Sequence, residues 1–178
     1  MAATTDRYNP AMGRLGRSLG AATAGAVCAA LTRALADEWF AHYNYWLASQ
    51  AVRGHWSPGV VELLAAKSAR ALSRADGLSR RARELGAEPP AKLADLLDRA
   101  SDKPFKLPRS LDDPRAILRA VLDAERTSIR TYAALVSRAG ERDVLTRRLA
   151  EDYLGEAVAG EQQLERLLGE DAPGLDGR

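Results

Sequence analysis

The sequence predicts one all-α domain, a four-helix bundle with one long crossover between its second and third helices. The composition is rich in Ala, Leu, Arg and Glu, which are strong helix formers. Apolar and small residues recur at steps of three and four in four long stretches. A proline-containing link after the second stretch is long enough to let the third helix run parallel to the second. We expect the bundle to cover residues 22–168, between an N-terminal tail, 1–21, and a C-terminal tail, 169–178.

The first helix is predicted over residues 22–53. One stripe of this helix carries, at steps of four and three, Leu31, Leu35, Glu38, His42 and Tyr45. A glutamate on such an inward stripe is rarely found without a partner. We therefore expect Glu38 to belong to a buried polar site.

The second helix has the most regular period in the chain and is predicted to begin near Pro58 and to close at Gly86. Its inward stripe consists mainly of small and apolar residues: Val61, Leu64, Ser68, Ala71, Ala75, Leu78, Ala82 and Leu85. The crossover that follows, residues 87–113, contains four prolines and a short helical piece near residues 91–99.

The third helix is predicted to begin at the capping pair Asp113-Pro114 and to end near Gly140. Its inward stripe comprises Ile117, Val121, Glu125, Tyr132 and Leu135.

The fourth helix is predicted from Asp143 to about residue 168. Its stripe comprises Leu145, Leu149, Tyr153, Ala157, Gly160, Leu164 and Leu167.

Charge and cysteine content narrow the classes of function. The formal net charge of +2 is too close to balance to indicate nucleic-acid binding. Cys28 is the only cysteine, so no intrachain disulfide can form, and we expect a cytoplasmic protein. The sequence has no run of about 18 apolar residues, so we expect no membrane span. The basic cluster of Arg80, Arg81 and Arg83 is predicted to be a solvated face.

A repeated pattern points to the candidate site. Glu38 is followed seven residues later by Tyr45, and Glu125 is followed seven residues later by Tyr132. A spacing of seven places both members of each pair on one helix face, two turns apart. The bundle therefore carries two inward carboxylates, each with an inward tyrosine.

These segments resemble the ferritin superfamily, and within it most of all the bacterioferritin-type and Dps-like proteins, which store iron and consume peroxide. The similarity is carried by residues 31–46, 118–132 and 143–150. It implies a ferritin-like four-helix bundle in which Glu38 and Glu125 match the two single-carboxylate metal ligands. Tyr45 and Tyr132 match the tyrosines beside the metal site.

The same resemblance shows that four metal ligands are replaced. Members of the family carry a Glu-x-x-His pair on the second helix and another on the fourth. These pairs fall on Ala71 and Arg74, and on Ala157 and Gly160. A guanidinium can bind carboxylates in place of metal ions, so we infer that Arg74 neutralises both Glu38 and Glu125.

The resemblance and the replaced ligands together imply a degenerate di-iron site. We expect no catalytic residue and no resident cofactor, and a role as a non-catalytic structural subunit in an iron-storage or oxidative-stress assembly. The partners would be further copies of this chain or an active ferritin-like subunit. A haem between subunits would need an axial methionine, and the chain has only Met1 and Met12, both outside the core helices.

Two alternatives remain open at this point. In one, a rebuilt site of Glu38, His42, Glu125 and Glu156 holds iron or manganese and acts as an oxidase or ferroxidase. His42 and Glu156 are metal ligands only in that case; otherwise His42 is bonded locally and Glu156 faces solvent. In the other alternative, the vacated centre binds a small apolar or carboxylate ligand. Its lining would comprise Tyr45, Ala71, Arg74, Tyr132, Ala157 and Gly160.

Overall fold

The computed structural model describes residues 13, 15, 16, 24–52, 57–101 and 105–169, and all regular secondary structure in these residues is helical. The four long helices are α2 (Ala24–Ala51), α3 (Ser57–Glu84), α5 (Pro114–Ala139) and α6 (Val144–Leu168). A short helix, α4 (Leu93–Leu97), lies in the crossover between α3 and α5. The prediction of an all-α bundle with one long crossover is confirmed.

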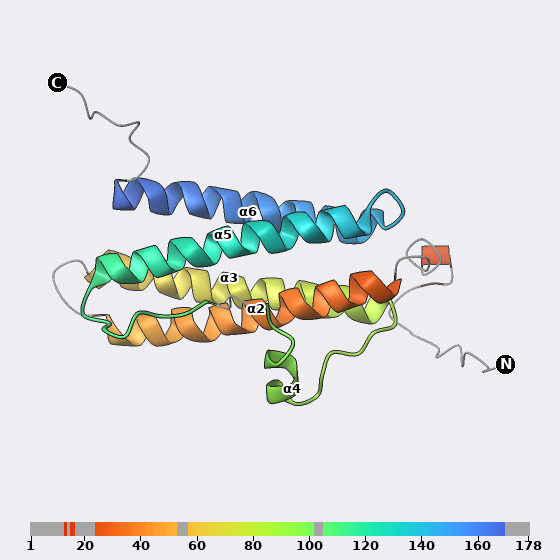
Figure 1. Ribbon diagram of the computed structural model, residues 1–178, viewed down its shortest axis with the longest axis horizontal. Coiled ribbons are helices and arrows are strands. Elements are labelled where there is room, and N and C mark those ends of the chain that lie inside the picture. The colour runs from red at the N-terminus through yellow and green to blue at the C-terminus, as the bar shows by residue number, and fades with distance from the viewer. Residues whose placement is uncertain (1–12, 14, 17–23, 53–56, 102–104, 170–178) are drawn as a thin grey trace, which may run out of the picture.

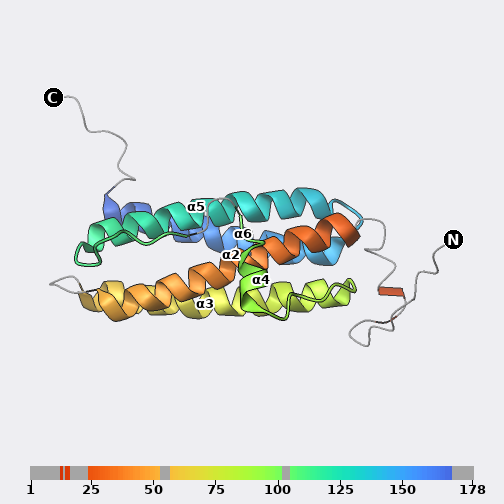
Figure 2. The ribbon, with the colours of Figure 1, turned by 60° about the horizontal axis from the view of Figure 1, so that its bottom comes forward.

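The bundle consists of two antiparallel helix pairs. Helix α2 packs most extensively on α3, and α5 packs most extensively on α6 (Figure 1). The crossover returns along the length of the bundle, so α5 runs in the same direction as α3 (Figure 1). Figure 2 shows α4 beside the α2–α3 pair, where it contacts α2. This topology brings the inward faces of all four long helices to one central axis.

The helix ends follow from local side-chain chemistry. Asp113 caps α5 by accepting hydrogen bonds from the backbone N–H groups of Arg115 and Ala116, at 2.9 and 3.1 Å. Pro114 occupies the first turn of that helix, as the sequence predicts. Gly86 follows α3 with a φ of 87°, a left-handed conformation that favours glycine.

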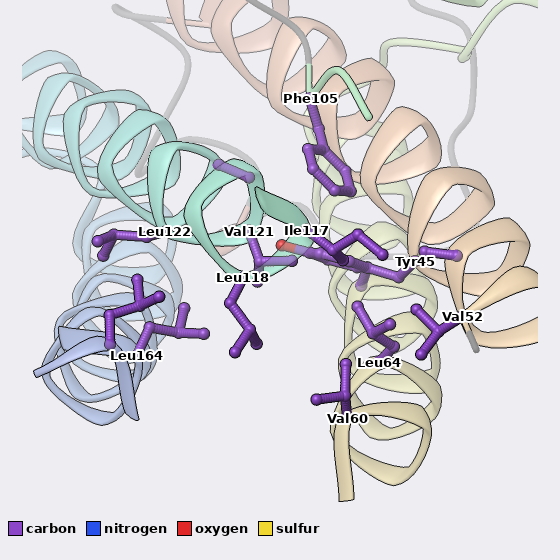
Figure 3. Packing of buried hydrophobic residues seen from close by; sticks show 14 residues of the cluster. Tyr45, Val52, Val60, Leu64, Phe105, Ile117, Leu118, Val121, Leu122 and Leu164 are labelled. Atoms are coloured by element: carbon purple, nitrogen blue, oxygen red, sulfur yellow. The ribbon is translucent and has the colours of Figure 1, made fainter. Parts of the chain in front are cut away.

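The apolar core is divided into two clusters along the bundle axis. One cluster packs Tyr45, Leu64, Phe105, Ile117 and other residues at the end where α2 finishes (Figure 3). The other cluster lies at the opposite end of the bundle, where α2 starts and α5 finishes. It consists of Val27, Leu31, Ala34, Leu35, Ala36, Ala75, Leu78, Ala82, Leu96, Tyr132, Leu135 and Ala150. Glu38 lies between the parts of α2 that supply the two clusters. The division leaves room for a buried polar layer at mid-bundle.

The prediction that Arg81 belongs to a solvated face is wrong. Arg81 is 4% exposed, and its Nη2 lies 2.7 Å from Asp143 Oδ1. Its Nε donates to Thr146 Oγ1 at 2.8 Å, and its Nη1 pairs with Glu84 at 2.7 Å. Asp143 also caps α6 through the backbone N–H of Thr146. Arg81 therefore joins the end of α3 to the start of α6.

Most of the two expected tails, 1–21 and 169–178, lies outside the described residues. Among the helices that are described, none combines the length and the apolar character needed to cross a membrane.

Candidate functional site at the bundle centre

Glu38 is the buried carboxylate that α2 presents to the centre, and it is 4% exposed. Its Oε1 accepts a hydrogen bond from the hydroxyl of Tyr132 on α5. The same oxygen lies 3.5 Å from Arg74 Nη1 on α3. Three helices thus meet at one carboxylate oxygen.

Burial is the main influence on the ionisation of Glu38. Loss of water raises its pKa from 4.5 to about 7, although the charge of Arg74 and the hydrogen bond from Tyr132 oppose that rise. For Arg74 itself, burial alone would lower the pKa, but the neighbouring carboxylates more than compensate and raise it. Burial also raises the pKa of Tyr132 well above its usual value. At neutral pH the arginine is therefore charged and the tyrosine is neutral.

Glu125 is the second buried carboxylate, presented by α5 and also 4% exposed. Its Oε1 lies 2.5 Å from Lys67 Nζ on α3. Its other oxygen, Oε2, is buried and has no hydrogen-bond partner within the described residues. An ion pair in a water-poor interior offsets the cost of burying the charge, which an unpaired carboxylate would bear in full.

The inferred pairing of Arg74 with both inward glutamates is therefore only half right. Arg74 pairs with Glu38, but its Nε lies 3.1 Å from Glu156 Oε2 on α6, and Glu125 is paired with Lys67 instead. The side chain of Glu156 is 42% exposed. It therefore reaches the rim of the site while it remains in contact with solvent.

The sequence of α3 explains how two cations reach the centre together. Lys67 and Arg74 are seven residues apart, so they share one helix face. Ala71 lies between them on that face and is 2% exposed. Its methyl group leaves space on both sides for the two long side chains.

Gly160 provides space for Glu125 from the opposite side. A Cβ atom added at Gly160 would lie 2.9 Å from Glu125 Cδ and 3.1 Å from each of its carboxylate oxygens. The carboxylate therefore lies against the bare backbone of α6. Ala157, one turn earlier on α6, is completely buried.

His42 is turned away from the carboxylates and toward α3. Its Nδ1 lies 2.9 Å from Ser68 Oγ and 3.0 Å from the Ser68 carbonyl oxygen, while Ser68 Oγ donates to the His42 carbonyl at 3.1 Å. His42 is therefore hydrogen-bonded to a residue of the neighbouring helix and not within its own helix. In the described part of the chain, no three His, Cys, Asp or Glu side chains are grouped closely enough to hold a metal ion. The rebuilt ligand set of Glu38, His42, Glu125 and Glu156 is therefore not assembled.

The two inward tyrosines have different surroundings. Tyr132 bonds to Glu38 and packs edge-on against Tyr153, with 5.5 Å between ring centroids. Tyr45 packs against Phe105 with 4.7 Å between centroids (Figure 3). Only Tyr132 has a hydrogen bond to one of the two central glutamates within the described residues.

The centre itself has little free space. The hollow bounded by Glu38, Tyr45, Ala71, Arg74 and Glu125, among others, measures only about 10 Å³, the lower limit of what one water molecule needs. The α3 cations therefore occupy part of the centre that the sequence predicts to be vacated. A larger cleft, of about 290 Å³, lies beside it between α3 and α6, and Lys67, Arg74, Glu125, Glu156 and Gly160 contribute to its walls.

Sequence reasoning missed Lys67. The signal was present, because Lys67 lies two turns before Arg74 and one turn before Ala71. A lysine next to an inward stripe usually extends to water, so spacing alone does not distinguish it from a surface residue. Its true position depends on the space that Ala71 and Gly160 leave, and on the charge of Glu125.

A sequence profile for a ferritin-like domain matches residues 28–172. The chain belongs to the ferritin-like family. The match covers most of the chain and takes in α3, α5, α6 and all but the first four residues of α2 in this ferritin-like protein. The sequence-based assignment is confirmed. A comparison with curated proteins gives no match.

Solved structures share the ferritin-like fold. A dodecameric thioferritin from Bacteroides fragilis, described as bacterioferritin-related, is 24% identical with a TM-score of 0.76, and the match covers 83% of this chain and 86% of that one. The Dps protein of Vibrio cholerae O1 is 20% identical with a TM-score of 0.76, over 83% of this chain and 92% of that one. Dps from Thermosynechococcus elongatus is 18% identical with a TM-score of 0.76, over 89% and 99%. Identities this low establish the fold alone.

Proposed function

We propose that this protein is a non-catalytic structural subunit of an iron-storage or oxidative-stress assembly of the Dps and bacterioferritin type. The observation that carries the proposal is that each inward glutamate is paired with a cation from α3. Lys67 pairs with Glu125, and Arg74 pairs with Glu38. In this interpretation the di-iron site of the family is degenerate.

The charge at the centre supports this interpretation. Two ferrous ions bring four positive charges, which members of the family balance with four carboxylates and complete with histidines. Here two glutamates face two cations, and the four remaining ligand positions carry Ala71, Arg74, Ala157 and Gly160. Metal binding would have to break both ion pairs and would gain two carboxylate ligands. The residues present do not fit a di-iron centre.

Exposed aromatic side chains support an oligomer. Tyr43 and Trp46 on α2 are 56% and 49% exposed, and their ring centroids lie 5.9 Å apart. Large exposed aromatics of this kind are enriched at protein interfaces. The bacterioferritin-related protein from Bacteroides fragilis is a dodecamer. We infer that this chain assembles with its own copies or with an active ferritin-like subunit.

Ferrous iron oxidation in air is the decisive test. The purified protein should oxidise iron at the rate of buffer alone, and the rate should be the same in Glu38→Gln and Glu125→Gln. Light scattering of the same sample should give an oligomer. Rapid oxidation that either substitution abolishes would refute the non-catalytic role, and a monomer with no affinity for another ferritin-like subunit would refute the structural one.

A further inference from the structure

The cleft between α3 and α6 opens beside the two buried ion pairs and has a volume of about 290 Å³. These helices belong to different antiparallel pairs and pack on each other only sparsely (Figure 1). Ala66 on α3 and Ala159 and Gly160 on α6 contribute to the walls. Such small residues keep the cleft open, because they fill little of the space between the helices.

The buried part of the wall carries two cations with unused hydrogen-bond donors. Arg74 is 6% exposed, and the side chain of Lys67 is 11% exposed. Lys67 Nζ has three N–H donors and binds only Glu125 within the described residues. Arg74 donates through Nε to Glu156 and through Nη1 to Glu38, which leaves Nη2 without a hydrogen bond in the same part of the chain. Because ion pairs already hold both cations, a ligand would immobilise them at less cost than it would mobile surface side chains.

An unsatisfied acceptor lies at the same wall. Glu125 is 4% exposed, and its Oε2 has no hydrogen-bond partner in the described residues. The carboxylate faces the notch that Gly160 leaves, since a Cβ atom there would lie 3.1 Å from each of its oxygens. Both Glu125 and Gly160 line the cleft. A ligand donor at the notch would therefore satisfy a buried acceptor that is otherwise costly.

The charges around the cleft favour an anion with one negative charge. Three cations line it, Lys67, Arg70 and Arg74, against the two carboxylates of Glu125 and Glu156. The wall therefore has an excess of one positive charge. Arg70 is exposed, so it extends the positive charge from the buried wall to the rim.

We propose that this cleft binds a small 2-hydroxy carboxylate. Its carboxylate group accepts hydrogen bonds from Arg70 and from the two buried cations, and its hydroxyl group donates to Glu125 Oε2. Ammonium and guanidinium groups are the strong donors for carboxylates. The volume lies at the lower end of small-molecule sites, which selects a ligand of few heavy atoms. The ligand does not occupy the hollow beside Tyr45, which holds at most one water molecule.

Equilibrium dialysis of the full chain with radiolabelled glycolate and acetate, at constant ionic strength, tests this proposal. Both probes carry one negative charge and are similar in size, but only glycolate has the hydroxyl group. Glycolate should bind at least about tenfold more tightly, the effect of one hydrogen bond to a charged group. Glycolamide keeps the hydroxyl and lacks the charge, so it should compete with labelled glycolate at least about tenfold less well than unlabelled glycolate does.

Two pairs of exposed residues place the ligand in the cleft without disturbing the core. Ala66→Leu should fill part of the cleft and weaken glycolate binding at least about tenfold, whereas Ala65→Leu should change it less than about twofold. Ala65 is the matched control, because both alanines are exposed on α3 and only Ala66 lines the cleft. Arg70→Gln should weaken both glycolate and acetate about tenfold. Its control is Arg148→Gln, at an exposed position on α6 outside the cleft.

The proposal fails if neither glycolate nor acetate binds. It also fails if the two bind equally, because Glu125 Oε2 then receives no hydrogen bond from the ligand. Equal glycolate binding by Ala66→Leu and Ala65→Leu would place the ligand elsewhere and would equally overturn it. The structural role is tested separately by iron oxidation and light scattering, so either proposal can fail while the other holds.

Discussion

Lys67 Nζ lies 2.5 Å from Glu125 Oε1, so the cation of this pair comes from the helix on which the family carries a Glu-x-x-His ligand pair. Arg74, two turns later on the same face, binds Glu38. Both charges that face the inward glutamates thus come from α3. The pairing is not complete, because Glu125 Oε2 is buried without a hydrogen-bond partner in the described residues.

Replacement of Lys67 by methionine should destabilise the fold strongly. The methionine keeps most of the apolar volume but leaves Glu125 as a buried charge without its partner. Such a loss costs about 3–5 kcal/mol. Arg70→Gln is the control, because Arg70 is exposed on the same helix, and its change should stay within about 0.5 kcal/mol. Urea unfolding measures both. Similar midpoints for the two variants would show that Lys67 is not bound to Glu125 in solution.

A double-mutant cycle should reveal the coupling between Arg74 and Glu38. Arg74→Met alone should cost about 3–5 kcal/mol, because it removes the charge that faces a buried carboxylate. Adding Glu38→Gln should recover much of that loss, because a neutral amide needs no cation. The interaction energy from thermal or urea melts should exceed about 1 kcal/mol. Strictly additive effects would contradict the pairing.

Stability should depend on pH through Glu38. Its pKa is about 7 in the folded protein against an ordinary 4.5, so between these values the folded state holds a proton that the unfolded state has lost. The free energy of unfolding should therefore fall as pH rises from about 4.5 to 7, by about 3 kcal/mol for this group. The Glu38→Gln variant should lose this slope.

Asp37 provides a comparison for that measurement, because it is a second carboxyl group whose pKa is raised. Burial raises its pKa too, so Asp37→Asn should remove a separate, additional part of the slope. A parent protein whose stability is flat across this range would mean that Glu38 is ionised throughout. Urea melts of the parent, Glu38→Gln and Asp37→Asn at a series of pH values measure these slopes.

The fold was predictable because local and global signals agree. The stripes of Leu31 and Leu35 on α2, and of Ile117 and Val121 on α5, have the period of a helix and lie in the core. The cap at Asp113 and the turn at Gly86 follow from single-residue chemistry. These features depend on neighbours in the sequence.

The electrostatic partners were less predictable, because they depend on distances between helices. Lys67 and Arg81 carry charges that sequence patterns assign to the surface. Yet Lys67 is only 11% exposed and Arg81 is buried, and each is paired with a carboxylate from another helix. Which glutamate pairs with Arg74 depends on the rotation of α3 against α2, α5 and α6. Periodicity gives the approximate face of a residue, although Leu145 and Leu167 on α6, which the stripe predicts to be inward, are 46% and 57% exposed. It does not give the partner of a residue.

Two glycines on α6 should respond in opposite ways to alanine. Gly155→Ala should stabilise the protein by about 0.5–1 kcal/mol, because alanine favours the helix and no other group lies within 4 Å of the new Cβ. Gly160→Ala should destabilise it, because its Cβ would lie 2.9 Å from Glu125 Cδ and force the carboxylate away from Lys67. Thermal melts measure both. Equal stabilisation would show that Glu125 moves aside freely.

Restoring the family ligands should create a metal site only if Lys67 is also removed. The four changes are Ala71→Glu, Arg74→His, Ala157→Glu and Gly160→His. With Lys67 retained, its ammonium group still binds Glu125 Oε1 and opposes any cation there.

Adding Lys67→Ala frees that carboxylate and opens space for the larger histidine at position 160, where overpacking against Glu125 is otherwise expected. Iron titration of folded protein should then give about two irons per chain in the five-fold variant, as in a di-iron bundle. The four-fold variant should bind fewer, and the parent is the baseline. If the four-fold and five-fold variants bind iron equally, Lys67 does not block the site. If both fold and neither binds, the helices do not converge at ligand distance, and the alignment of Ala71 and Ala157 with the lost glutamates is wrong.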